Sequence, residues 1–361
     1  MLRIEPRKEP SRLILYATPF IAVALTILSG FVLFSILDKD PVQATLLIFF
    51  KPLTSLYSIS EMIVKATPLI LIGVGLALCF QANVWNIGAE GQFTMGAICG
   101  GAVALALHGV PGFWVLPLVC AAGIAGGMIW AAIPALLRTR FNTNEILTSL
   151  MLVYVATLTL NVLMHGALRD PQGHNFPESK LFHDAATLPI LISDTRAHIG
   201  FVFALLFVVL GWILLRWHVI GFQIKVSGQA PRAARYAGFS SDRVVWFSLL
   251  VSGALAGLAG IFEAAGPVGQ LVPALPVGYG FTAIIVAFLG RLHPVGVLLA
   301  GLLLALTYIG GEGAQIAMKL PAATTQVFQG MLLFYLLAMD IFVNYRIRMR
   351  RAAAASGSAA Q

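Results

Sequence analysis

Long apolar runs separated by short polar stretches make up almost the whole of this 361-residue chain. A helix that crosses a bilayer needs about 20 mostly apolar residues. We expect ten membrane-spanning helices, over residues 13–37, 62–80, 92–109, 113–137, 146–165, 199–217, 244–262, 279–290, 295–310 and 323–345. The eighth run is too short to cross unless it includes the glycine-rich stretch before it, so its boundaries stay open.

The composition also indicates a membrane protein. Hydrophobic residues make up 59% of the chain and charged residues 11%, and the mean hydropathy is +0.89. Ordinary soluble chains carry roughly 25% charged residues, so lipid must be the outer solvent here. The three cysteines, Cys79, Cys99 and Cys120, lie in apolar stretches without a CxxC pair. They indicate buried small side chains and neither a disulfide framework nor a zinc site.

The net charge of +8 does not indicate nucleic acid binding, because no basic stripe or nucleic-acid-binding motif accompanies it. Membrane proteins gather lysine and arginine in cytoplasmic loops. With a cytoplasmic N-terminus, ten spans place both termini in the cytoplasm and 16 of the 23 basic residues on that side. These residues are Arg3, Arg7, Lys8, Arg12, Arg138, Arg140, Arg216, Lys225, Arg232, Arg235, Arg243, Arg291, Arg346, Arg348, Arg350 and Arg351.

This orientation divides the chain into regions. Residues 1–12 are a cytoplasmic N-terminal segment, residues 13–345 the transmembrane domain, and residues 346–361 a cytoplasmic tail that we expect to be disordered. The first apolar run exceeds the roughly 7–15 residues of a signal peptide core and lacks a clear cleavage site, so we expect an uncleaved helix.

The external loop, residues 166–198, is polar and interrupted by prolines. His165, His174, His183 and His198 lie in or beside it at irregular spacings, without an adjacent pair at ligand spacing. We therefore expect a surface for an external partner and no metal site.

The cytoplasmic loop, residues 218–243, contains a segment suited to docking. Proline favours the first turn of a helix and glycine its end, so RAARYA between Pro231 and Gly238 predicts a short helix with exposed arginines. An ordinary positive-inside loop explains the arginines but not a helix bounded by glycines. The candidate docking residues are Gly228, Pro231, Arg232, Ala233, Ala234, Arg235, Tyr236 and Gly238.

Catalytic and nucleotide-binding motifs are absent from the sequence. It contains no G-x-x-x-x-G-K-[ST] P-loop and no Gly-Lys pair at all. No nucleophile, base and metal set converges, so we do not expect an enzyme. Carboxylates within the spans are scarce, whereas ion-coupled carriers place them deep in their spans. A translocation path driven by energy from elsewhere is expected, without a cofactor bound by this chain.

The segment NVWNIGAEGQF, residues 83–93, is the polar exception between two apolar runs. Glu90 and Gln92 lie at a span start, where a carboxylate suits unpaired N–H groups and the helix dipole. This capping role is one interpretation. The other is a break in the span that lines a path, because an ionised glutamate in hydrocarbon costs at least about 2.5–3 kcal/mol and must face protein, water or a helix end. The path candidates are Asn83, Asn86, Glu90 and Gln92.

Three motifs give the chain a family resemblance. NVWNIGAEGQFTMGA, GQAPRAARYAGFSSDRV and GYGFTAIIVAFLGRLHPVG resemble the permease subunits of bacterial ABC importers, in a likeness that extends from about residue 13 to 345. Within these permeases, the chain is similar to the ribose and branched-chain amino acid permease superfamily, on its nucleoside or "basic membrane protein" branch.

The resemblance implies a type II ABC importer fold, multi-pass in the bacterial inner membrane. It implies three protein partners: an ABC ATPase that uses the ATP and contacts the second motif, a second paralogous permease, and an external substrate-binding protein or lipoprotein. Family substrates include purine and pyrimidine nucleosides, and simple sugars are the nearest alternative. A stand-alone secondary transporter is a further alternative, but it would not need the docking loop.

Overall fold

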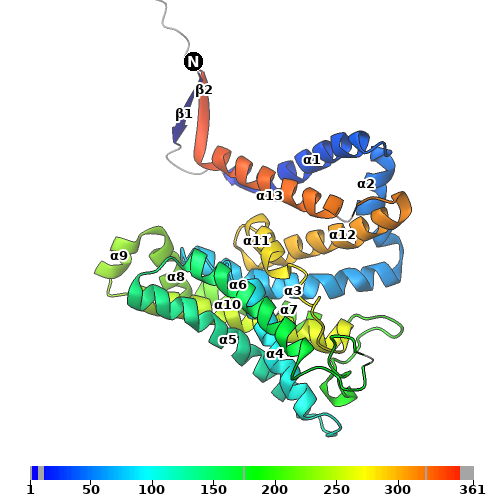
Figure 1. Cartoon of the computed structure of the whole chain (residues 1–361). Helices are drawn as coiled ribbons and strands as arrows, with labels where there is room; N and C mark the ends of the chain where they lie inside the picture. The colour runs from blue at the N-terminus through cyan, green and yellow to red at the C-terminus, as the bar shows by residue number, and fades with distance from the viewer. Residues whose placement is uncertain (1, 7–11, 174, 322, 350–361) are drawn as a thin grey trace, which may run out of the picture. The chain divides into compact units, whose positions relative to one another are not determined.

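The structure is a computed structural model that describes residues 2–6, 12–173, 175–321 and 323–349 (Figure 1). The described residues are almost all helical. The helices are α1 (Arg12–Ile36), α2 (Pro41–Phe49), α3 (Leu56–Gln81), α4 (Ala89–Ala106), α5 (Val115–Phe141), α6 (Glu145–His165), α7 (Gly200–Trp217), α8 (Val219–Gln229), α9 (Pro231–Tyr236), α10 (Ser241–Glu263), α11 (Tyr279–Leu289), α12 (Pro294–Met318) and α13 (Ala323–Asn344). The strands β1 (Leu2–Pro6) and β2 (Tyr345–Met349) pair antiparallel, and a π-helical turn, Ala264–Val268, continues α10.

Each of the ten predicted apolar runs lies on a helix. Within the described ranges, seven helices are long and apolar enough to cross a membrane: Ala17–Ile36, Leu56–Gln81, Val115–Phe141, Glu145–His165, Gly200–Trp217, Ser241–Val268 and Pro294–Met318. Two more, α11 and the stretch Ala323–Met339, are apolar but shorter. Helix α4 is as long as α7 but carries polar residues in its first turn. The predicted nearly all-helical, multi-pass class is confirmed, and about ten spans are compatible with these helices.

Two helices, α2 and α8, lie in stretches that the hydrophobic pattern left as loops, and α12 is longer than expected. It continues to Met318, past the predicted end at residue 310 and through Gly310, Gly311 and Gly313. Each glycine weakens a helix by about 1 kcal/mol. However, Gly310 lets α12 lie on the backbone of α2, since a Cβ there would come within 1.9 Å of the Ile48 carbonyl oxygen. Close packing therefore offsets the weak helix propensity.

The chain divides into two compact units, residues 1–45 with 321–361 and residues 46–320. In the first unit α1 packs along α13, where a Phe328 ring lies against Gly30 and the hydroxyls of Ser29 and Tyr335 hydrogen-bond. This unit therefore joins the two ends of the sequence.

The strand pairing in this unit bears on the termini. Leu2 lies opposite Met349 and Pro6 opposite Tyr345, so the beginning of α1 and the end of α13 lie side by side. This agrees with an even number of spans and termini on one side of the membrane; which side stays a prediction. Residues 346–349 of the predicted tail belong to β2, and 350–361 lie outside the described residues.

Glycine contacts hold the centre of the second unit together. Helix α10 packs against α3, α4 and α5. A Cβ at Gly127 of α5 would lie 2.1 Å from the carbonyl oxygen of Gly253, and one at Gly96 of α4 would lie 2.2 Å from Cα of Gly257. Small residues let helix backbones approach this closely in lipid. The glycine-rich runs therefore serve as helix contacts around α10.

The external loop lies against the segment that follows α10. The Leu188 amide donates to the Ala265 carbonyl at 2.9 Å. Arg196, near the end of the loop, forms an ion pair with Glu61 in the second turn of α3, with Nε and Oε1 2.9 Å apart. These contacts fix the loop over the start of α3 and the end of α10, two helix ends that the predicted topology places on the same side as the loop.

Candidate functional site

The polar motif after α3 forms a non-helical segment, residues 82–88, inside the helical unit. Asn83 has a φ of +56°, and the chain turns back there. Asn86 Nδ2 donates to Ser252 Oγ at 3.0 Å, and Ser252 in turn packs on Gly75 of α3. Asn86 therefore lies level with Gly75, which is six residues, or about 9 Å along the helix axis, before the end of α3. The break runs back alongside α3 instead of lying beyond its end.

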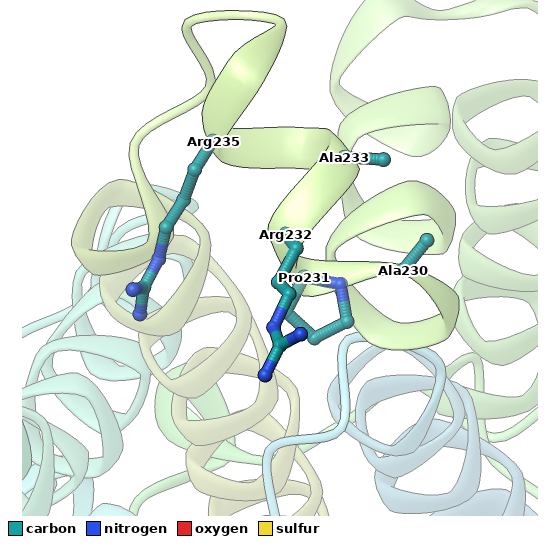
Figure 2. Close-up of a pocket in the computed structure, with 5 residues that line it drawn as sticks. All are labelled: Ala230, Pro231, Arg232, Ala233 and Arg235. Atoms are coloured by element: carbon teal, nitrogen blue, oxygen red, sulfur yellow. The ribbon is translucent and has the colours of Figure 1, made fainter.

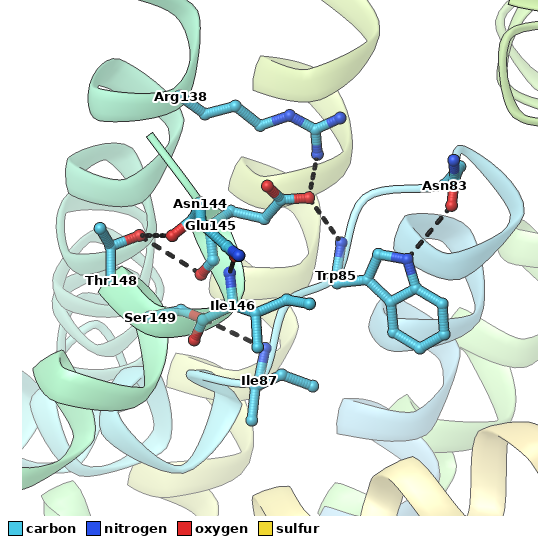
Figure 3. Close-up of polar contacts among 9 residues, drawn as sticks. All are labelled: Asn83, Trp85, Ile87, Arg138, Asn144, Glu145, Ile146, Thr148 and Ser149. Atoms are coloured by element: carbon cyan, nitrogen blue, oxygen red, sulfur yellow. Dashed lines mark hydrogen bonds and ion pairs between the residues drawn. The ribbon is translucent and has the colours of Figure 1, made fainter. Parts of the chain in front are cut away.

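Protein groups satisfy the backbone of this segment. The Val84 amide donates to the Cys79 carbonyl at 2.9 Å. Figure 3 shows two contacts from α6: the Trp85 amide donates to Glu145 Oε1 and the Ile87 amide to Ser149 Oγ, each at 3.3 Å. Unpaired backbone groups are not tolerated in lipid. The side chains of α6 therefore substitute for the helical hydrogen bonds that the break gives up.

The same carboxylate ties the segment to α5. Glu145, the first residue of α6, also accepts a hydrogen bond from the Arg138 guanidinium near the end of α5 (Figure 3). Both side chains are mostly buried, with 14% of Glu145 and 26% of Arg138 exposed. One ion pair therefore fixes the turn between α5 and α6 and one edge of the break.

Asn86 and Gln92 bind each other. Asn86 Nδ2 donates to Gln92 Oε1 at 2.9 Å, and Gln92 Nε2 donates to Asn86 Oδ1 at 3.0 Å. The Gly88 amide also donates to Asn86 Oδ1, at 3.2 Å. The two side chains are 0% and 1% exposed. The amide pair thus bridges the break to the first turn of α4.

Glu90 is bound to a different helix from its own. Its carboxylate accepts hydrogen bonds from the backbone amides of Gly278, at 2.8 Å, and of Gly280. These amides belong to the N-terminal end of α11, whose 11 residues span about 16 Å, roughly half a bilayer. A helix N-terminus carries a partial positive charge. The buried carboxylate therefore caps a half-length helix that begins inside the protein.

Asn83 lies apart from these buried residues. It is exposed, and its Oδ1 accepts a hydrogen bond from Trp85 Nε1 at 3.1 Å (Figure 3). The indole ring stacks near Phe80 and Phe288, with centroids 5.2 and 6.1 Å away. Of the four predicted path residues, three are buried with protein partners, and Asn83 alone is exposed.

The cytoplasmic loop contains the predicted short helix. Helix α9 is PRAARY, with Pro231 as its first residue, and Gly238, two residues after its end, has a φ of +79°. Ala234 is fully buried, whereas Tyr236 is 94% exposed. Figure 2 shows the exposed Arg232 and Arg235 extending in the same direction from α9. They line a hollow of about 600 Å³ together with Ala230, Pro231 and Ala233.

Gly228 connects this loop to the break. It lies near the end of α8, where a Cβ would come within 2.0 Å of the Gln81 carbonyl oxygen. Gln81 is the last residue of α3, and the break begins at the next residue. The Gln81 side chain also donates to the Leu292 carbonyl, with Nε2 and O 2.6 Å apart. Helix α8, which leads directly into α9, therefore packs on the start of the break.

The sequence patterns did not identify a second polar cluster, around Lys65. The Lys65 ammonium donates to the Tyr279 hydroxyl at 3.0 Å, and this hydroxyl donates to Glu263 Oε1 at 3.2 Å. The cluster thus joins α3, α11 and α10. A lysine inside the apolar run 62–80 was the available signal, since charged residues within spans are rare and face protein or water.

Comparison with known proteins identifies relatives over most of the chain. Residues 58–337 match the family described as branched-chain amino acid transport system / permease component. The chain is 38% identical to the glucose ABC transporter permease protein TsgB13 of Haloferax volcanii, over 96% of this chain and 93% of that protein. It is 31% identical to the guanosine ABC transporter permease protein NupP of Bacillus subtilis, over 88% and 91% of the two chains. It is 29% identical to the nucleoside ABC transporter permease protein NupB of Lactococcus lactis, over 82% and 83%.

Proposed function

This chain belongs to the branched-chain amino acid transport system permease family, and we propose that the solute it moves is a nucleoside. It is an ABC permease subunit and not an enzyme, like the relatives that it matches. The similarity to NupP and NupB, named for guanosine and nucleosides, carries the choice of solute. The similarity to TsgB13, named for glucose, makes a simple sugar the second candidate.

Uptake measurements test the solute. Cells with and without the gene take up labelled guanosine, uridine, glucose and leucine, and each unlabelled compound then competes with the one that enters. We expect gene-dependent uptake of the two nucleosides and competition between them. Gene-dependent uptake of glucose alone would transfer the assignment to the sugar.

The partners that we propose are an ABC ATPase, a second paralogous permease and an external substrate-binding protein or lipoprotein. The geometry of α9 supports the first. Its buried Ala234 anchors the helix, while its arginines and Tyr236 are exposed beside a hollow. An exposed, basic, aromatic surface in the predicted cytoplasmic loop suits a soluble partner. A carrier that works alone would have no use for this surface.

We propose further that motion of the ATPase reaches the membrane through Gly228. Because this glycine lies directly on the Gln81 carbonyl, a displacement of α8 and α9 would push the end of α3 and the start of the break. Well-packed interiors transmit such displacements because they have few voids. The contact connects α8, which leads into the docking helix, to the residue before the non-helical segment.

The path-lining role of Asn83, Asn86, Glu90 and Gln92 stays a proposal. The buried amide pair would have to rearrange before a solute could reach it, and such a rearrangement suits a gate. We expect Asn86→Ala to keep expression and ATPase association but to lower uptake, because it removes both bonds of the pair. Normal uptake in Asn86→Ala and in Gln92→Ala would leave these side chains with a structural role only.

A further inference from the structure

The polar cluster around Lys65 has an unusual position in the protein. Lys65 lies nine residues after the start of α3, which is about 14 Å along the helix. Glu263 is the last residue of α10, and Tyr279 is the first of the half-length helix α11. The Lys65 ammonium also lies 5.5 Å from the centroid of the Tyr279 ring. Three helices thus direct an ammonium, a phenol and a carboxylate at one point.

One atom of the cluster has no partner within the described part of the chain. Glu263 is 7% exposed, and its Oε2 is buried without a hydrogen bond, whereas Oε1 accepts from Tyr279. Leaving a buried charged acceptor unsatisfied is expensive. An oxygen in this state is available to a ligand that carries a donor.

The cluster is least buried on the side of Lys65 and of α12, where Tyr308 lies 6.5 Å from Tyr279 between ring centroids. Lys65 is only partly buried, and so is Tyr308, whose hydroxyl lies 3.0 Å from that of Thr282. Glu312, one turn after Tyr308 on the same helix face, is exposed. An ionised carboxylate in hydrocarbon costs at least about 2.5–3 kcal/mol. This face of α12 therefore borders water or protein, and a solute that binds the cluster would approach from it.

The charges of the cluster restrict the ligand. The Lys65 ammonium and the Glu263 carboxylate, with phenol hydroxyls beside them, carry no net charge between them. Of the neighbouring charged groups, Glu61 and Arg196 form an ion pair with each other, and Glu312 is exposed. The cluster offers donors from lysine and the unpartnered Oε2 of glutamate as an acceptor, which matches neighbouring hydroxyl groups on a sugar ring. A carboxylate solute would meet Glu263, and a cationic solute would meet Lys65, so both are disfavoured.

We propose that Lys65, Tyr279 and Glu263 form a contact site for the vicinal hydroxyls of an uncharged sugar ring during transport. The ribose of a nucleoside and a free hexose both carry such hydroxyls. The site therefore rests on the proposed import function but not on the choice between these two solutes.

The test uses the complete importer in liposomes, with its binding protein saturated by solute so that the external affinity does not limit the rate. The maximal transport rate is measured for a ribonucleoside and for its 3′-deoxy analogue; glucose and 3-deoxyglucose replace them if the uptake assay assigns a hexose. We expect Glu263→Gln to lower the rate for the full hydroxyl set about tenfold, because a charged hydrogen bond becomes a neutral one. The rate for the deoxy analogue should change by less than about threefold.

Tyr279→Phe is the second variant, because it removes one hydroxyl without changing the size of the buried ring; it should also bring the two rates together. Asp40→Asn is the matched control, since the Asp40 side chain accepts from the Val42 and Gln43 amides at the start of α2 and asparagine keeps this cap. Equal losses for the two solutes, or no loss for either, would overturn the contact site. Absence of uptake by the unmodified importer would refute the proposed function and the site with it. Normal uptake by the unmodified importer, with the same ratio of the two solutes' rates in both variants, would refute the site alone.

Discussion

Replacing Glu90 with alanine tests what holds the half-length helix α11 in place. The carboxylate is 3% exposed and accepts hydrogen bonds from the amides of Gly278 and Gly280. Alanine leaves two N–H groups without an acceptor, a buried one at Gly280 and a half-buried one at Gly278, and each loss costs about 1–3 kcal/mol. We expect Glu90→Ala to lower the free energy of unfolding by about 2–6 kcal/mol, a large part of the roughly 5–15 kcal/mol of a typical protein.

Asp242 provides the matched control. It is also an acidic residue in the first turn of a helix, α10, but it is exposed. Asp242→Ala should remove only an interaction with the positive end of its own helix, worth about 0.3–1 kcal/mol. Thermal unfolding of the detergent-purified protein, followed by tryptophan fluorescence, compares the two variants. Equal and small losses would refute the role at α11 and leave Glu90 as a capping residue of α4 alone.

Three further predictions concern the topology, the docking helix and an external histidine. In a protein without its native cysteines, a cysteine at the exposed Asn175 should react with an impermeant thiol reagent from outside, and one at the exposed Gln229 should not. Labelling of the cysteine at Gln229 from outside would show that the true topology is the reverse of the predicted one. Ala233→Trp should stop copurification of the ATPase but leave the melting temperature unchanged, because Ala233 is exposed. Ala234→Trp should lower the melting temperature, because Ala234 is fully buried. Normal copurification and coupled uptake in both variants would count against docking at α9. Burial lowers the pKa of His198 from 6.5 to about 4, so as the pH falls this histidine takes up a proton in the unfolded chain before it does so in the folded protein. The free energy of unfolding should therefore decline between pH 6.5 and 4, by up to about 3 kcal/mol. His198→Gln should show a flatter pH dependence of the melting temperature.

The hydrophobic pattern predicted most of the helices because each apolar run exceeds the length of a strand or turn. It missed α2 and α8, which are 9 and 11 residues long. Helices this short are marginal on their own and form through packing. Gly228 illustrates the reason: its close approach to Gln81 stabilises α8 in the fold but leaves no mark in the local pattern.

The candidate site was predicted in part. The motif placed Asn86 and Gln92 six residues apart, near enough in sequence to suggest a common cluster, although not their reciprocal bonds. Glu90 could be assigned only to the helix that it begins. Its partners, Gly278 and Gly280, follow about 190 residues later, and one sequence gives no means of pairing residues so far apart. The Lys65 cluster was missed for the same reason, since its members come from three helices.

The pairing of α1 with α13 has a consequence for the synthesis of the protein. Helix α1 leaves the ribosome before α13, against which it packs, and about 290 residues separate them, which takes about 15–60 s at the usual rate of synthesis. During this interval α1 must stay in the bilayer with lipid as its only neighbour on that face. Its span has the highest mean hydropathy of the seven described spans, 2.3, so it is stable in lipid before its partner helix is made. A chain released early, near residue 320, would contain the whole second unit yet present an unmatched α1 to the proteases that remove incomplete membrane proteins.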